Sequence, residues 1–435
     1  MYDIGELHLR ADGGELVTAQ LQQVLDQCGS NGGGIVRFPA GTYRVGGLEL
    51  HDNIRVVLEP GCLLLGSLDL KDYPLYSTVE DYPFDEGQEG VRAIFFARNC
   101  KNISILGGGV IRGGGEGFAN CGTRRARPRN LLFAGCDGVT VRDIRLEESG
   151  FWNQHYLQCR NVLVDSVRVH SLHGINNDGL DIDSCCNAVV RNCRIDSQDD
   201  AICLKCDTSV PCENVIVTDC ITSTHANHFK LGTESHGGFR NVRAANLTMI
   251  PSELPVSTHV GGGDFRGASG IALGAIDGAF IDNVVVENVC MDGVRVPLFL
   301  RQGDCRRSCP GLGPTEPTYV RGVTLRRIVA RKASTQGCFF IGLPERPMED
   351  VRLLDSQLEF EGDPAPEYFR RIVPDDRKIR CDMEAFGAFP SYGVFARYVK
   401  GLRLENVDFT TIADDPRPAV IYEKCADVKV DVTDN

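Results

Sequence analysis

Only one of the 435 residues is Trp, and no apolar run approaches the ~20 residues that a membrane-spanning helix needs. Positive charge is also scarce: the net charge of −13 argues against nucleic acid binding, because phosphate contacts need a basic surface. The first residues, MYDIGELHLRADGG, have neither the basic start nor the apolar core of a signal peptide. We therefore expect no membrane or nucleic acid partner and a cytoplasmic location, unless a leader has been removed. The oligomeric state is not predicted.

The composition is that of a globular protein with many thiols. The 42% hydrophobic residues exclude a disordered chain, and the 48 glycines show no collagen-like period. Most of the 19 cysteines lie inside apolar strand-like runs, where free thiols pack well as small buried groups. The pairs Cys203/Cys206 and Cys305/Cys309 are weak zinc signals, because no second pair with suitable His stands at ligand spacing. We expect no metal and no cofactor.

Short phrases of alternating apolar and polar residues recur along the chain, each behind a turn-forming Asn, Gly or Asp. The steps from Asn161 to Asn187, Asn214 and Asn241 are 26, 27 and 27 residues. A fixed period in this range indicates stacked structural repeats. Apolar residues at helical spacing are missing from the phrases, so each repeat is predicted to be one coil of parallel strands. The sequence predicts an all-β, right-handed parallel β-helix, continuous from residue 1 to 435 as a single domain.

Two kinds of segment interrupt the repeat. Residues 17–29 are predicted to form a helix that caps the N-terminal end of the stack, where strand edges would otherwise be exposed. Longer steps between phrases indicate insertions that shape a cleft. We expect them near residues 70–95, 250–270, 301–318 and 360–392.

Aligning the apolar residues of three successive coils brings aspartates together. With Leu180, Ile202 and Phe229 in one column, Asp178 and Asp200 become close neighbours, and Asp199 lies at the same turn. Acids this close repel one another and raise at least one pKa, which suits a proton donor and acceptor. A calcium site or ordinary turn chemistry also fits this spacing.

These residues resemble the polygalacturonase family, glycoside hydrolase family 28. Asn176-Asn177-Asp178-Gly179 is similar to that family's Asn-Thr-Asp-Gly element, and Asp199-Asp200 is similar to its paired aspartates. Segments near the start (GGGIVRFPAGTYRVGGLEL) and centre (Arg127 to Cys159) and the position of Lys205 also fit, so the resemblance covers most of the chain. It implies hydrolysis with inversion at the anomeric carbon. Asp199 would be the general acid, and Asp178 and Asp200 would activate water, without a metal or organic cofactor.

The sequence departs from the family pattern at two elements. Asn227 stands where the family has histidine, and Ala272 and Gly274 stand where it has the Arg and Lys that grip a galacturonate carboxylate. The substrate is therefore expected to be a neutral or modified sugar rather than plain galacturonan. Further residues are predicted to bind the sugar: Asn177, Lys205, Asn227, His228, Lys230, Glu234, His236, Arg301, and Trp152 with His155 as a platform. The arginines at 124, 125, 127 and 129 are expected to form a solvated basic loop.

We expect an exo-acting enzyme that trims oligosaccharides in carbohydrate or pectin breakdown. Three alternatives remain: an exo-galacturonidase whose carboxylate-binding residues have moved, for example to Lys230 or Arg301; a β-helix lyase or epimerase; and a carbohydrate-binding β-helix without catalysis.

Overall fold

A computed structural model describes residues 1–83, 91–118, 126–254, 266–304, 318–366 and 372–434. The chain divides into two compact units, Met1–Ala201 and Ile202–Asn435. Each unit consists of parallel strands stacked coil upon coil, which confirms the predicted parallel β-helix. Continuity of the chain as one domain stays a prediction.

In the unit Met1–Ala201 a coil contributes strands to three parallel ladders. The first comprises β1 (Tyr2–Asp3), β3 (Gly34–Phe38), β6 (Ile54–Leu58), β9 (Lys101–Gly107), β12 (Asp137–Arg142), β15 (Arg160–Asp165) and β18 (Cys186–Arg191). The second comprises β2 (Asp12–Leu16), β4 (Gly41–Val45), β7 (Cys62–Gly66), β10 (Val110–Arg112), β13 (Arg145–Glu147), β16 (Arg168–Ser171) and β19 (Arg194–Ser197). The third comprises β5 (Leu48–Glu49), β8 (Ala93–Arg98), β11 (Arg129–Ala134), β14 (Gln154–Leu157) and β17 (Leu180–Asp183).

The turns between coils explain the recurring asparagines. Asn161 and Asn187 adopt left-handed backbone conformations, with φ of 54° and 61°, which Asn tolerates better than most residues. Their side chains stack: Asn187 Nδ2 donates to Asn161 Oδ1 at 3.4 Å, and Asn161 Nδ2 donates to Asp137 Oδ1 at 2.7 Å. Behind each turn the apolar residues point inward, so that Val162 and Ala188 are register partners in the core. The repeat phrases therefore mark real coils.

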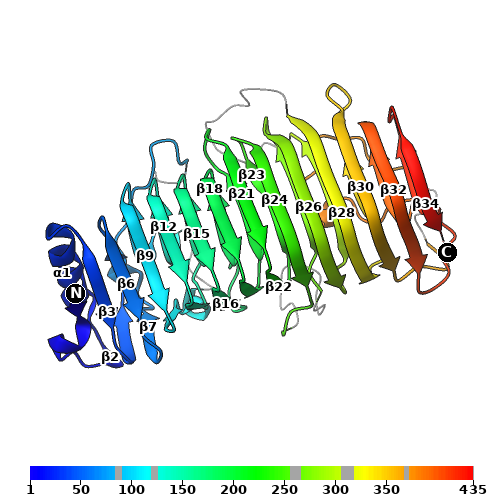
Figure 1. The fold of residues 1–435 in the computed structure, drawn as a ribbon. Coiled ribbons are helices and arrows are strands. Elements are labelled where there is room, and N and C mark those ends of the chain that lie inside the picture. Colours follow the sequence, from blue (N-terminus) through cyan, green and yellow to red (C-terminus); the bar gives the residue numbers. More distant parts are fainter. Residues whose placement is uncertain (84–90, 119–125, 255–265, 305–317, 367–371, 435) are drawn as a thin grey trace. The chain divides into compact units, whose positions relative to one another are not determined.

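The predicted capping helix is α1 (Thr18–Ser30), at the N-terminal end of this unit (Figure 1). It buries Leu21, Leu25 and Cys28 and packs against β3, β5 and β6. Four short 3-10 helices complete the described helical segments: η1 (Ile4–Leu7), η2 (Leu70–Asp72), η4 (Gly115–Phe118) and η6 (Met383–Ala385). Among the described residues, no helix has the length and apolar character that a bilayer crossing requires.

The unit Ile202–Asn435 repeats the same arrangement with longer strands. One sheet comprises β21 (Cys212–Thr218), β22 (Ile221–Thr224), β24 (Phe239–Met249), β26 (Phe280–Asp292), β28 (Tyr319–Ala333), β30 (Met348–Phe360), β32 (Val399–Thr411) and β34 (Lys429–Asp434). The other comprises β20 (Ile202–Cys206), β23 (Asn227–Ser235), β25 (Ser269–Ile276), β27 (Val296–Gly303), β29 (Cys338–Ile341), β31 (Val394–Arg397) and β33 (Val420–Glu423). Ile202 pairs with Phe229 and Leu204 with Leu231, as the sequence alignment of these coils predicted.

Most of the described cysteines are buried thiols, as the sequence predicted. None of those in the described ranges forms a disulfide. Burial raises the pKa of the Cys338 thiol to about 12, which keeps it protonated and unreactive. The cytoplasmic location stays a prediction.

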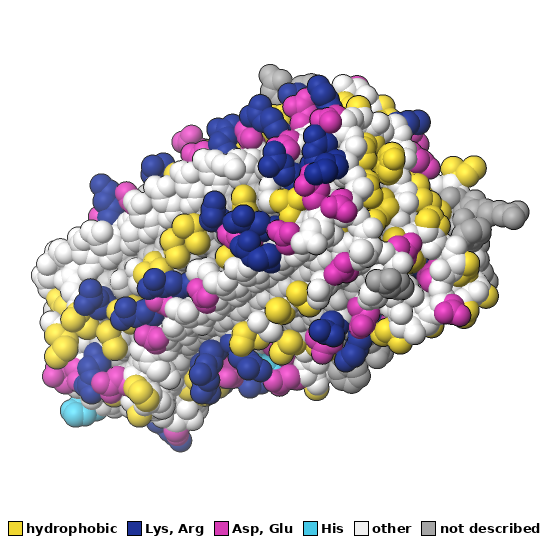
Figure 2. Space-filling model, turned by 45° about the vertical axis from the view of Figure 1, so that its right-hand side comes forward, with side chains coloured by type: hydrophobic (Ala, Val, Ile, Leu, Met, Phe, Trp, Pro, Cys, Tyr) yellow, Lys and Arg dark blue, Asp and Glu magenta, His cyan; other side chains and the backbone are white. Residues whose placement is uncertain are grey.

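Charged side chains of both signs lie side by side on the face that Figure 2 shows. In the unit Ile202–Asn435, pairs of this kind link neighbouring strands: Arg321 Nη2 lies 2.7 Å from Asp282 Oδ2, and Arg327 Nη2 lies 2.6 Å from Glu287 Oε2. The arginine side chains of these pairs are about half exposed, and each pair at the surface contributes little to stability by itself.

Candidate active site

Asp178 and Asp200 lie on adjacent coils of the unit Met1–Ala201. The Gly179 N–H donates to the Asp200 carbonyl oxygen at 2.8 Å, and a carboxylate oxygen of Asp178 lies within 4.8 Å of one of Asp200. Both side chains are almost fully buried, with 2% of their surface exposed. Because two carboxylates this close disfavour double ionisation, the pair is suited to take up a proton.

The close approach of the two coils depends on Gly179. A Cβ atom there would lie 2.6 Å from the carbonyl oxygen of Ala201 and 2.4 Å from Cγ2 of Ile195. The glycine directly after Asp178 is therefore needed for the spacing that brings the carboxylates together.

Asp199 is the most open of the three aspartates, because it is only partly buried. Its Oδ2 accepts from Asn176 Nδ2 at 3.1 Å, and its Oδ1 accepts from the Asp200 N–H at 3.0 Å. The Ser197 hydroxyl donates to the Asp199 carbonyl oxygen at 2.8 Å. Both carboxyl oxygens and the backbone are thus held at the turn that precedes Asp200.

The loop before Asp178 is anchored from inside. Asn177 is fully buried, and its Nδ2 donates to Ser171 Oγ at 3.1 Å and to the His173 carbonyl oxygen at 2.9 Å. Glu148 accepts from the His173 N–H at 3.0 Å and pairs with His173 Nδ1 at 3.0 Å. Asn177, predicted to bind substrate, has its amide nitrogen engaged within the loop, which favours a supporting role.

Trp152 and His155 lie together in the same unit, and both are buried. Their rings meet edge to face at 4.9 Å, and Phe151 stacks on Trp152 at 4.8 Å. His155 Nε2 lies 3.0 Å from Asp183 Oδ2. A sugar platform stays a prediction, and with 4% of Trp152 and none of His155 exposed, these contacts favour packing behind the site.

The expectation of a solvated arginine loop is wrong for Arg127 and Arg129. Arg127 is 2% exposed and Arg129 fully buried, because Arg129 begins strand β11 and both guanidinium groups lie over the Phe151 ring, at 5.3 and 4.8 Å. Arg127 also donates to the Asn176 side chain, as described below. The arginines at 124 and 125 lie outside the described residues.

In the unit Ile202–Asn435, Lys205 and Glu234 come together. Lys205 Nζ lies 3.5 Å from Glu234 Oε2, on neighbouring strands β20 and β23. Lys230 and His236, on and just after β23, each expose 8% of their surface. Lys205, Lys230 and Glu234 thus share one sheet, with His236 in the turn directly after it, and the contact of these residues with sugar stays a prediction.

Asn227 and His228 begin strand β23. Asn227 Oδ1 accepts from the Ser269 hydroxyl, and His228 Nδ1 lies 2.9 Å from Thr222 Oγ1. Complete burial lowers the pKa of His228 to about 3, so the imidazole is neutral at physiological pH. This favours a packing role for His228, although its predicted contact with sugar is not tested.

Ala272 and Gly274 lie on β25 beneath a chain segment that folds over the sheet. Ala272 is fully buried in an apolar cluster formed by residues of β27, β29 and β31 and of the segment 373–389, namely Phe299, Phe339, Phe395, Val373, Cys381, Met383, Phe386 and Phe389. A Cβ atom at Gly274 would lie 2.9 Å from Cys381 Sγ. The side chains of this cluster therefore fill the space where the family's Arg and Lys would lie.

The two cations proposed as replacements are register partners of these positions. Lys230 pairs with Ala272, and Arg301 pairs with Gly274. Arg301 is 2% exposed, donates to the Asp376 carbonyl oxygen at 2.9 Å and lies 5.2 Å from the Phe386 ring centre. Arg301 thus holds the covering segment.

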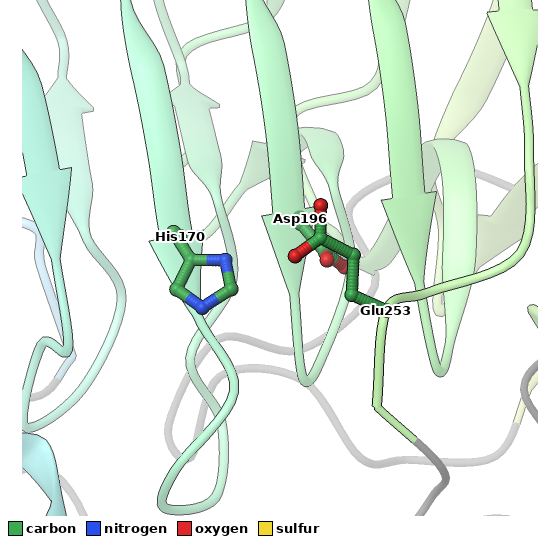
Figure 3. Close-up of side chains that lie close together, drawn as sticks. All are labelled: His170, Asp196 and Glu253. Carbon is green, nitrogen blue, oxygen red and sulfur yellow. The ribbon is translucent and has the colours of Figure 1, made fainter.

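Sequence inspection missed one further juxtaposition, between His170 and Asp196. They are register partners on β16 and β19, with a ring nitrogen and a carboxylate oxygen within 4.8 Å (Figure 3). The period of the repeat could have revealed it, because 26 residues separate the two. A pair alone does not make a metal site, and we assign it no function.

Comparison with known proteins identifies relatives of this arrangement. Residues 77–368 match the profile of Glycosyl hydrolases family 28. A "Probable polygalacturonase" of Vitis vinifera is 23% identical over 360 residues, covering 78% of this chain and 70% of that protein. An "Exo-poly-alpha-D-galacturonosidase" of Dickeya chrysanthemi is 23% identical over 254 residues, covering 46% of this chain and 41% of that protein.

Two solved structures show the same fold. The exopolygalacturonase of Yersinia enterocolitica superposes with a TM-score of 0.74 at 18% identity, covering 100% of this chain and 78% of that one. The exopolygalacturonase of Thermotoga maritima gives a TM-score of 0.68 at 18% identity, covering 94% of this chain and 91% of that one.

Proposed function

The chain belongs to family 28 of the glycosyl hydrolases and is a polygalacturonase-like glycosidase, and on that premise we propose that it is an exo-acting hydrolase that inverts the anomeric centre of its oligosaccharide substrate. The observation that carries the proposal is the meeting of three aspartates at one turn: Asp178 and Asp200 on adjacent coils, and Asp199 beside them.

We assign the proton donor to Asp199, which is the most open of the three and would protonate the leaving oxygen. Asp178 and Asp200, with carboxylate oxygens within 4.8 Å of each other, would activate the attacking water. One of the pair can take the proton of that water, since the two carboxylates disfavour double ionisation. Inverting enzymes need room for a water molecule between acid and base. The Asp199 proton passes to the leaving oxygen as the glycosidic C–O bond breaks, the hydroxyl group of water bonds to the anomeric carbon, and the remaining proton of that water passes to the Asp178–Asp200 pair.

The covered positions on β25 support a substrate other than plain galacturonan. A sugar carboxylate would need cationic partners where Ala272 and Gly274 lie, and Cys381 and its neighbours fill that space instead. We propose a neutral or modified sugar at this subsite.

The same covering segment supports exo action. In the unit Ile202–Asn435 the described part of the 360–392 insertion closes over Ala272, Phe299, Phe339 and Phe395, which follow one another along the outer face of the sheet. A polymer could not continue along strands that are covered in this way. We propose that the segment ends the binding cleft.

The second candidate is an exo-galacturonidase, because Lys230 is the register partner of Ala272 and so lies beside the position of a lost cation. Testing the wild-type protein on matched neutral and galacturonate oligosaccharides separates the two. Cleavage of neutral or substituted oligosaccharides supports our proposal, and efficient release of galacturonate from digalacturonate supports the second candidate. A product that absorbs in the ultraviolet would indicate a lyase, and no cleavage with retained binding would indicate a binding protein.

A further inference from the structure

Arg127 is a buried cation whose hydrogen bonds lead to Asp199. Its Nη1 donates to the Ile175 carbonyl oxygen at 2.7 Å, and its Nη2 donates to Asn176 Oδ1 at 3.2 Å. Asn176 Nδ2 in turn donates to Asp199 Oδ2 at 3.1 Å. All four residues belong to the unit Met1–Ala201.

We infer that Arg127 is a positioning residue for the reaction, which orients Asn176 and through it the carboxyl group of Asp199. This inference rests on the proposed function, in which Asp199 protonates the leaving oxygen.

The hydrogen-bonding chemistry of Arg127, Asn176 and Asp199 fixes which atom of the Asn176 amide faces each neighbour. A guanidinium group can only donate hydrogen bonds, so the atom of Asn176 that faces Arg127 must be the amide oxygen. The amide nitrogen then faces Asp199 and can only donate to it. Without the arginine, the Asn176 amide could rotate by half a turn, and its nitrogen would no longer donate to Asp199 Oδ2.

Arg127 also contacts the backbone of this turn. Asn176 has a φ of 57°, a left-handed conformation that Asn tolerates better than most residues. Arg127 holds this segment at two points, the carbonyl oxygen of Ile175 and the side chain of Asn176. The Phe151 ring, 5.3 Å from the guanidinium carbon, fixes the arginine itself. The cation therefore orders a turn whose next residues are Asn177 and Asp178.

The second oxygen of Asp199 is fixed independently, because Oδ1 accepts from the Asp200 N–H at 3.0 Å. With Asn176 on Oδ2, each oxygen of the carboxyl group accepts a hydrogen bond. Loss of the Asn176 contact removes the donor to Oδ2 and lets the carboxyl group turn about its remaining contacts. A displacement of about 1 Å in a catalytic group can lower a rate by about 100-fold.

The test uses Arg127→Met, which keeps the side-chain bulk, and Arg127→Lys, which keeps the charge but lacks the planar fork whose two nitrogens reach the two acceptors. Asn176→Gly removes the side chain that links Arg127 to Asp199, and glycine readily adopts the left-handed backbone conformation. The matched control is Arg112→Gln, because Arg112 lies at the surface of the same unit and pairs there with Glu116 at 2.8 Å and Glu147 at 3.9 Å. Each variant is assayed on the oligosaccharide that the wild type hydrolyses and on an aryl glycoside of the same sugar with a good leaving group. The Tm of each variant is also measured.

We expect Arg127→Met and Asn176→Gly to lower kcat on the oligosaccharide by about 100-fold, with KM changed less than about threefold. On the aryl glycoside, whose leaving group needs little protonation, the loss should be under about tenfold. Arg127→Lys should lie between, and Arg112→Gln should match the wild type. If Arg127→Met does not fold, Arg127→Lys and Asn176→Gly decide together, and wild-type rates in Arg127→Lys then overturn the inference.

Equal losses on both substrates, or wild-type rates in Arg127→Met and Asn176→Gly, overturn the inference. The proposed function fails in a different way, namely if the wild type cleaves no glycoside or if Asp199→Asn is as active as the wild type.

Discussion

The N–H of Gly179 donates to the carbonyl oxygen of Asp200 at 2.8 Å, and this hydrogen bond ties the residue directly after Asp178 to Asp200 on the adjacent coil. The bond forms only because residue 179 has no side chain, since a Cβ atom would stand 2.6 Å from the next carbonyl oxygen. The spacing of the two carboxylates is therefore a property of the backbone.

Replacing Gly179 by Ala should disturb this spacing directly. We expect the added methyl group to push the two coils apart and to lower the free energy of unfolding by about 1–3 kcal/mol, the usual cost of overpacking. Activity should fall far more than this loss of stability explains. The comparison is Gly138→Ala, at a turn with φ of 79° outside the site, which should destabilise the fold without a specific loss of kcat.

Asp199→Asn and Asp178→Asn should differ in their response to the leaving group. Each should lower the rate on an oligosaccharide by about 10²–10⁴-fold, because each removes a proton-transferring group. Only Asp199→Asn should recover on an aryl glycoside with a good leaving group. Recovery by Asp178→Asn instead would reverse the assignments of acid and base.

The free energy of unfolding should decrease as the pH is lowered, because of His228. Burial lowers the pKa of this residue from 6.5 to about 3. The unfolded chain takes up a proton below about pH 6.5 that the folded chain does not take up until about pH 3. The contribution of neutral His228 is thus complete above pH 6.5 and lost as the pH falls from there. At pH 5 the protonation of this histidine in the unfolded chain should lower the free energy of unfolding by about 2 kcal/mol relative to neutral pH. Denaturation of the wild type and of His228→Gln at pH 7.5 and 5.0 checks this: a wild type that loses no more than the variant contradicts it.

Removal of metal ions should leave activity unchanged, because carboxyl groups alone can supply the acid and the base. Dialysis against a chelator followed by assay with and without added Ca²⁺ is the measurement. Activity that disappears on dialysis and returns with Ca²⁺ would favour the alternative hypothesis that Asp178 and Asp200 bind calcium.

The repeat phrases predicted most of the fold, because each coil repeats the same local chemistry: a left-handed Asn at the turn and alternating apolar residues behind it. The aspartates could be placed together for the same reason, since residues of adjacent coils stack in register. Arg127 could not be recognised, because its burial depends on Phe151, 24 residues further along the chain. The covering of Ala272 was equally hidden, because Cys381 reaches it from a segment more than 100 residues away without a periodic pattern.

The most direct test of the account is the configuration of the first sugar released by the wild-type enzyme, followed by proton NMR before mutarotation. A proton donor and a water-activating pair acting on opposite sides of the bond predict a product with the anomeric configuration opposite to that of the substrate. A product that retains the configuration of the substrate, or one with the vinylic proton of an unsaturated sugar, would contradict inverting hydrolysis by Asp178, Asp199 and Asp200.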